Sequence, residues 1–154
     1  MPVVRVYVPL GGARLGDLAG RGALPASLDA PVEAFAVTDE LTAQSPGLDE
    51  EGLEYAAFVD AVAAAGGLRL HRRDRRLVIA ADVDPEALQP GDGTPLSAIL
   101  LVADLPVSRI ASLHVDEAGQ HPAAAPDEAG SLLWYDVTEL REVVRFFPGP
   151  DHTR

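Results

Sequence analysis

The stretch "VVRVYVP", residues 3–9, decides the fold because β-branched residues alternate along it. Such alternation predicts a strand with two different faces, which ends at Pro9 because proline offers no N–H to a β-ladder. One face carries the valines at positions 4, 6 and 8, and the other carries Arg5 and Tyr7. We therefore expect a sheet that buries the valine face and presents Arg5 and Tyr7 on the opposite side.

The other patterns along the chain predict an α+β protein. Apolar runs bounded by turn residues predict further strands at 32–38, 75–83, 97–104, 109–116 and 132–136. Apolar residues spaced three and four positions apart, or residues that favour helix caps, predict helices at 13–22, 48–65 and 136–144. We expect a single domain over residues 1–154, with a mixed sheet of about five to six strands and about two to three helices mainly on one face.

Three details of that arrangement can be predicted from the order and character of the segments. The strand–helix–strand order over residues 3–38 predicts a parallel, right-handed crossover. The run at 97–104 is apolar on both faces, which predicts a central strand. The proline-punctuated segment 121–130 is predicted to be a loop, and residues 146–154 a flexible tail.

Composition excludes several classes of function. The 24 acidic and 12 basic residues give a net charge of −12, which repels nucleic acid and anionic membranes. There are 0 cysteines, so disulfides, thiolate metal sites and a cysteine nucleophile are ruled out. Apolar runs such as 98–103 are far shorter than the ~20 residues that a membrane helix needs, and no signal-peptide pattern begins the chain. We expect a cytoplasmic protein.

The acidic stretch "LDEEGLEYAAFVDAV", residues 48–62, is interpreted as a helix start. Asp49 suits the N-cap, and Glu50 and Glu51 then favour the positive end of the helix dipole. Glu54 lies one turn further and is not needed for capping, so it is the carboxylate in this stretch that we retain as a candidate functional residue. The remaining apolar pattern predicts a buried stripe formed by Tyr55, Phe58, Val59, Val62 and Ala65. The glycine pair Gly66–Gly67 predicts a left-handed cap at the end of the helix.

A candidate ligand site arises where polar strand faces could coincide. His114 shares one side of its strand with Ser112, as Arg5 and Tyr7 share one side of the first strand. If these faces meet, Arg5, Tyr7 and His114 would line a cleft suited to an anion, with His114 available as an acid or base. Glu54 would lie nearby, and Trp134 or Tyr135 would close the cleft. The alternative is a half-solvated sheet face with a hydrogen-bonded histidine.

Two charged clusters offer weaker candidates. The arginine cluster at 69–76 could bind phosphate or a second copy of the chain, but it has no interleaved aromatic residue and suits a solvated loop. Nucleic-acid binding through it is therefore disfavoured. Four strand-terminal acids could hold a divalent cation only if their strands end at one edge of the sheet, and antiparallel strands would separate them. These acids are Asp82, Asp84, Asp104 and Asp116.

Six segments together resemble a family of small acidic actinobacterial proteins that is described as a domain of unknown function. They are "RVYVPL" at 5–10, "AFAVT" at 34–38, "EEGLEYAAFVDA" at 50–61, "RRLVIAADV" at 75–83, "IASLHVD" at 110–116 and "LLWYDVTEL" at 132–140. The resemblance implies a single domain and no particular activity. The chain departs from the pattern at "GGLRLHRRDRR", which replaces a more apolar helix end and marks a variable loop.

These observations predict no catalytic residues, no metal site and no cofactor. The leading hypothesis is a non-enzymatic cytoplasmic protein that acts through an unknown protein partner or through self-association. The alternative is a small-molecule or anion-binding protein, with a hydrolase as a variant of that hypothesis. Its site would lie on the sheet face and comprise Arg5, Tyr7, Glu54, His114 and Trp134.

Overall fold

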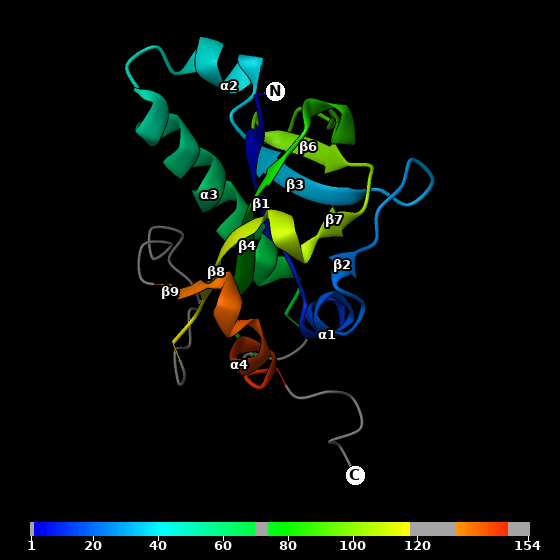
Figure 1. The fold of residues 1–154 in the computed structure, drawn as a ribbon. Coiled ribbons are helices and arrows are strands. Elements are labelled where there is room, and N and C mark those ends of the chain that lie inside the picture. Colours follow the sequence, from blue (N-terminus) through cyan, green and yellow to red (C-terminus); the bar gives the residue numbers. More distant parts are fainter. Residues whose placement is uncertain (1, 70–73, 118–131, 148–154) are drawn as a thin grey trace.

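The computed structural model describes residues 2–69, 74–117 and 132–147 (Figure 1). The strands are β1 (Val4–Pro9), β2 (Ala23–Leu24), β3 (Val32–Ala36), β4 (Leu77–Val83), β5 (Leu88–Pro90), β6 (Ala98–Leu101), β7 (Leu105–Pro106), β8 (Ile110–Val115) and β9 (Leu133–Asp136). The α-helices are α1 (Gly12–Arg21), α2 (Asp39–Gln44), α3 (Glu50–Gly67) and α4 (Leu140–Val144). Short 3-10 helices are η1 (Pro85–Ala87), η2 (Val107–Arg109) and η4 (Val137–Glu139). The α+β class is confirmed.

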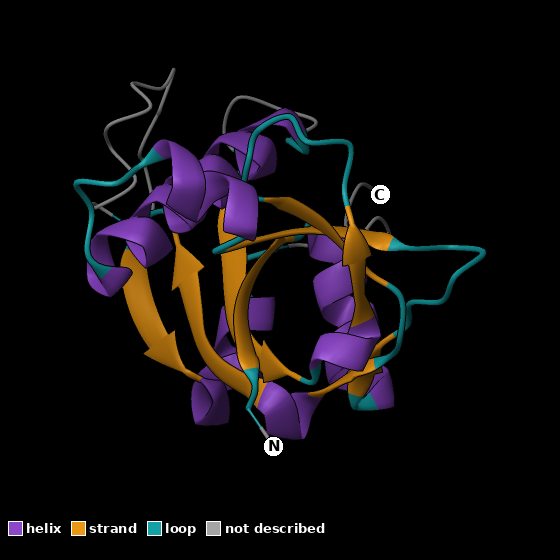
Figure 2. Cartoon of the chain, turned by 90° about the horizontal axis from the view of Figure 1, so that it is seen from above, coloured by secondary structure: helices purple, strands orange, loops and turns teal. Residues whose placement is uncertain are grey.

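One 7-stranded sheet, in the order β5-β6-β3-β1-β4-β8-β9, forms the centre of the fold. Its neighbouring strands all pair antiparallel, so the predicted mixed sheet and the predicted parallel crossover between β1 and β3 are wrong. Strand β6 lies next to the edge strand β5, and β1 occupies the middle, so the prediction of a central strand at 97–104 is also wrong. A separate pair, β2 and β7, forms a 2-stranded sheet, and Figure 2 shows that the large sheet is strongly curved.

The two faces of the curved sheet support separate cores. The larger core contains the valine face of β1, with Val6 and Val8 fully buried, together with Leu15 and Leu18 of α1 and parts of α4. The second core lies under α3, where Tyr7 packs with alanines of that helix. Helices therefore cover both faces, not mainly one, as Figure 1 shows for α3 on one side and for α1 and α4 on the other. The alternation of β1 accounts for this division.

Helix α3 begins as predicted. The Asp49 side chain accepts a hydrogen bond of 2.8 Å from the Gly52 N–H, and Glu50 and Glu51 occupy the first turn. Its C-terminus differs, because Gly66 and Gly67 are helical and the cap, Leu68, is right-handed.

The buried stripe of α3 is rotated from the predicted one. Tyr55 is 50% exposed, and the buried residues are Leu53, Ala57, Ala61, Val62 and Ala65. The alanines let the helix approach the sheet closely, whereas a tyrosine at their position would hold it away. This rotation turns a neighbouring stripe of α3 toward solvent.

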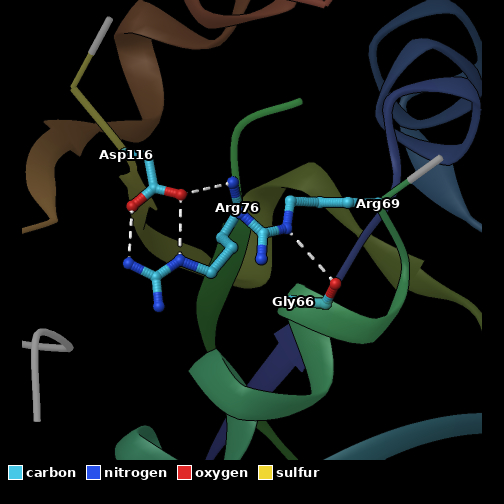
Figure 3. A network of polar contacts seen from close by, with 4 residues as sticks. All are labelled: Gly66, Arg69, Arg76 and Asp116. Atoms are coloured by element: carbon cyan, nitrogen blue, oxygen red, sulfur yellow. Dashed lines mark hydrogen bonds and ion pairs between the residues drawn. The ribbon is translucent and has the colours of Figure 1, made fainter. Parts of the chain in front are cut away.

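A buried ion pair joins the start of β4 to the end of β8 (Figure 3). Arg76 donates from Nε and NH2 to the two carboxylate oxygens of Asp116, at 2.9 and 2.8 Å, and its backbone N–H donates at 2.7 Å. Asp116 returns a backbone bond to the Arg76 carbonyl at 3.1 Å. Arg69, from the same arginine cluster, donates to the Gly66 carbonyl at 3.3 Å. Two of these arginines are therefore structural, while residues 70–73 lie outside the described part of the chain.

The C-terminal segment confirms one prediction and revises another. Asp136 and Glu139 form the capping box that their spacing predicts. Phe146 and Phe147 pack against the larger core, so these two residues do not belong to a flexible tail. The remainder of the predicted tail, 148–154, and the predicted loop at 121–130 lie outside the described residues. Within the described residues, no helix has the length and apolar character needed to cross a membrane.

Candidate functional site

An open cleft of about 420 Å³ lies between α3 and the sheet strands β1, β4, β8 and β9. Its described lining residues combine aromatic rings, two carboxylates and a few hydrogen-bonding groups. They are Arg5, Tyr7, Glu51, Glu54, Tyr55, Phe58, Ala80, Ser112, His114 and Trp134. All five residues predicted for the ligand site, Arg5, Tyr7, Glu54, His114 and Trp134, are therefore brought together here. Tyr135, the alternative to Trp134, packs on Phe146 instead, at a ring distance of 5.6 Å.

The register of the sheet builds the floor of the cleft. Tyr7 pairs with Ala80, and Ala80 pairs with Ser112, so these three residues form one row across β1, β4 and β8. In the next row, His114 pairs with Trp134 on β9. The methyl group of Ala80 lies between larger neighbours, which leaves depth at the centre of the floor.

Helix α3 supplies the opposite wall. Glu51, Glu54, Tyr55 and Phe58 follow the i, i+3, i+4, i+7 spacing that places residues on one helix face. The sequence pattern predicts Glu54 as a candidate site residue, but it predicts Tyr55 and Phe58 in the buried stripe and Glu51 at the helix start. The helical spacing from Glu54 was the signal that could have identified the other three.

Phe58 connects the helix wall to the floor through ring contacts. Its ring centroid lies 5.7 Å from that of Tyr7 and 5.0 Å from that of His114, both edge-to-face. Tyr55 extends this aromatic wall outward, at 6.3 Å from Phe58. Such contacts fix the side chains that shape the cleft.

The positive charge of Arg5 is balanced within the protein. Arg5 Nε lies 2.8 Å from Asp82 Oδ1, and NH2 lies 3.2 Å from Oδ2, across the β1–β4 pair. The hydrogen bond to Asp82 is the main cause that raises the pKa of Arg5, and the charge of Glu54 also contributes. With Asp82, Glu51 and Glu54 around a single arginine, the cleft region is net negative. This charge balance is unfavourable for an anion.

His114 is held in its neutral form. Burial, and then the charge of Arg5, lower the pKa of His114 from 6.5 to about 4. One ring nitrogen, Nε2, lies 2.9 Å from the hydroxyl oxygen of Ser112. At neutral pH the imidazole therefore cannot supply a proton as a general acid, and it is a weak base.

Tyr7 is also neutral and acts as a hydrogen-bonding group of the floor. Burial raises its pKa above 10.0, and the charge of Glu54 acts in the same direction, while Arg5 opposes both. The cleft thus presents a phenol, a hydroxyl and a neutral imidazole beneath an aromatic wall. These groups can orient a ligand by hydrogen bonds and ring contacts.

The strand-terminal acids do not gather. Asp82 pairs with Arg5, Asp84 lies 3.6 Å from Arg109, and Asp116 pairs with Arg76. Asp104 accepts a 3.0 Å hydrogen bond from the Ala26 N–H. Within the described ranges, no group of three or more potential ligands could hold a metal ion. Strand β4 ends at the edge of the sheet opposite to the ends of β6 and β8, and β3, β1 and β4 lie between β6 and β8, which separates the acids.

Fold and cleft together define a small α+β protein with an antiparallel sheet and an open, acidic, aromatic-walled cleft under one helix. The chain belongs to the family of unknown function DUF6912, whose pattern matches residues 4–144. This confirms the resemblance to a domain of unknown function that covers most of the chain. No curated protein and no solved structure matches the chain significantly.

Proposed function

We propose that this is a non-enzymatic binding protein whose cleft under α3 takes a small molecule. One observation supports this most directly: side chains from β1, α3, β8 and β9 converge on one open cleft of about 420 Å³. That volume falls within the range of about 300–1,000 Å³ typical of ligand pockets. A cytoplasmic location and an actinobacterial source remain predictions.

The chemistry of the floor favours binding over catalysis. Ser112 and His114 resemble a nucleophile and base, but the pKa of His114, about 4, makes it a poor base for a serine hydroxyl. Ser112 also lies within β8, paired with both β4 and β9, so its backbone belongs to the sheet ladders. A hydrolase would need backbone donors directed at the reacting oxygen.

A fragment screen tests the proposal through the single tryptophan, Trp134, whose fluorescence reports directly on the cleft. Ring-containing fragments that raise the melting temperature are titrated while tryptophan emission is followed. We expect saturable changes in emission that Tyr55→Ala weakens. The matched control is Leu68→Ala, which removes a similarly exposed side chain, 47% against 50%, at the far end of the same helix. Stabilising fragments that leave the emission unchanged would overturn the proposal.

A second candidate function, association with a protein partner, is supported by the exposure of β9. Trp134 is 62% exposed and Leu133 is 39% exposed on this strand, which terminates the described sheet. Edge strands can pair with a strand from another chain. The net charge of −12 opposes indiscriminate self-association and favours a basic partner.

Leu133 separates the two functions because it lies on β9 but does not line the cleft. We expect Leu133→Asp to abolish capture of a partner in pull-downs and any dimer detected by light scattering, while fragment binding persists. Tyr55→Ala should have the reverse effect. A strictly monomeric protein that retains no partner would refute the association hypothesis.

A further inference from the structure

Resting on the proposed function, we propose that the cleft selects a small organic cation: a primary ammonium or guanidinium group on an apolar or aromatic body. The sequence pattern by itself favours an anion, because Arg5, Tyr7 and His114 are common anion-recognising residues. In the structure, the partners and protonation states of those residues instead favour a ligand of positive charge.

Neither positively chargeable residue of the cleft is available to an anion. Asp82 holds the Arg5 guanidinium at two points, 2.8 and 3.2 Å, so an anion would have to compete with a carboxylate already in place. His114 is half-buried against Phe58, with ring centroids 5.0 Å apart, and this burial disfavours the imidazolium form. The floor therefore offers neutral hydrogen-bonding groups beside one neutralised arginine.

The helix wall supplies the negative charge. Glu51 and Glu54 both line the cleft, and neither forms a salt bridge among the described residues. The positive end of the α3 dipole opposes a cation with about half an elementary charge, which is well below the charge of two carboxylates. A cation between the two glutamates would thus meet a favourable net potential.

The aromatic rim fits the body of such a ligand. Trp134 and Tyr55 stand at the mouth with 62% and 50% of their surfaces exposed, so their ring faces are accessible. Cations are attracted to aromatic faces, most strongly to tryptophan, and flat apolar groups stack on them. The same rings can therefore contact both the charged group and the apolar body of the ligand.

Three probes with a common phenyl ring test the charge preference at constant ionic strength. They are phenethylammonium, 2-phenylethanol and phenylacetate, each titrated against Trp134 fluorescence. We expect the cation to bind most tightly and the anion most weakly. Glu54→Gln should weaken the binding of phenethylammonium by roughly two- to fivefold, as expected for partly exposed charge pairs, and leave the binding of 2-phenylethanol unchanged. The control, Glu142→Gln, removes an exposed carboxylate on α4 and should change the affinity for neither probe.

The outcomes separate this inference from the proposed function. If 2-phenylethanol or phenylacetate binds the cleft as tightly as phenethylammonium, the cation preference is refuted while small-molecule binding stands. The preference is equally refuted if Glu54→Gln and Glu142→Gln weaken the binding of the cation to the same extent, because the net charge of the protein would then explain the preference. If phenethylammonium does not bind at all, the cation inference fails, and the fragment screen decides the proposed function independently.

Discussion

Arg5 and Asp82 lie directly opposite each other on β1 and β4 and form a two-point ion pair, with Nε–Oδ1 at 2.8 Å and NH2–Oδ2 at 3.2 Å. About a third of each side chain is exposed, 36% and 37%, so the pair stands at the boundary between sheet and solvent. An ion pair this exposed to solvent adds little to the free energy of unfolding. Its effect on the cleft is larger, because it removes the positive charge that an anion would need.

Replacing Asp82 should change the ligand preference of the cleft. In Asp82→Asn, Arg5 loses its carboxylate partner, and we expect phenylacetate to bind several-fold more tightly and phenethylammonium more weakly. Fluorescence titration of both probes measures the change. Asp84→Asn is the control, since its carboxylate pairs with Arg109 outside the cleft lining. An unchanged preference in Asp82→Asn would show that this pair does not set the charge selectivity.

The buried pair of Arg76 and Asp116 should dominate the electrostatic contribution to stability. Only 5% and 3% of these side chains are exposed, and Asp116 accepts hydrogen bonds from both the side chain and backbone of Arg76. Asp116→Ala leaves a buried guanidinium unpaired, so we expect the free energy of unfolding to fall by about 3–5 kcal/mol.

Urea denaturation checks this loss. The control is Asp84→Ala, which breaks the exposed pair with Arg109, where the side chains are 41% and 50% exposed, and should cost less than about 1 kcal/mol. Equal losses in the two variants would contradict the structural role assigned to the buried pair.

His114 should make stability depend on pH in the acidic range. Its pKa falls from 6.5 to about 4 on folding, so between these values the unfolded chain binds a proton that the folded protein does not. The free energy of unfolding should therefore decrease as pH falls from 6.5 to about 4. His114→Gln should show a shallower decrease over this window. An imidazole NMR signal assigned to His114 that titrates near 6.5 in the folded protein would contradict the burial argument.

The helix-start interpretation of Asp49 predicts a modest and specific cost. Asp49→Ala removes the acceptor for the Gly52 N–H, and we expect a loss of about 1 kcal/mol in the free energy of unfolding. Asp49→Asn keeps an acceptor oxygen and should lose only a few tenths of that amount. Urea denaturation distinguishes the two variants. Similar losses in both would assign the stabilisation to the charge at the helix dipole rather than to the cap.

Local patterns in the sequence predicted most elements but not their arrangement. The alternation of β1, the Asp49 cap and the Asp136–Glu139 capping box depend on neighbouring residues, and the structure confirms all three. Strand order depends on the path of the connecting segments, which periodicity does not encode. For that reason the parallel crossover between β1 and β3 was wrong.

The cleft residues were partly predictable because local alternation determines which face of a strand a residue lies on. Alternation correctly placed Arg5 and Tyr7 on one face, and the antiparallel register then brought His114 and Trp134 beside them. The prediction that Tyr55 is buried is wrong because an aromatic residue counts as apolar in a periodic pattern, although Ala57, Ala61 and Ala65 are the buried residues of that helix while Tyr55 is 50% exposed. The pairing of Arg5 with Asp82 links β1 to β4, and no local pattern predicts it.

NMR mapping of phenethylammonium binding tests the central claim, that the cleft under α3 binds an organic cation, most directly. The side-chain indole signal belongs to Trp134 alone, because the chain has 1 tryptophan. The account predicts that this signal and the backbone amides of Ser112 and His114 shift together and saturate with one dissociation constant. Shifts that do not saturate, or that arise only from residues on the α1 and α4 side of the sheet, would contradict it.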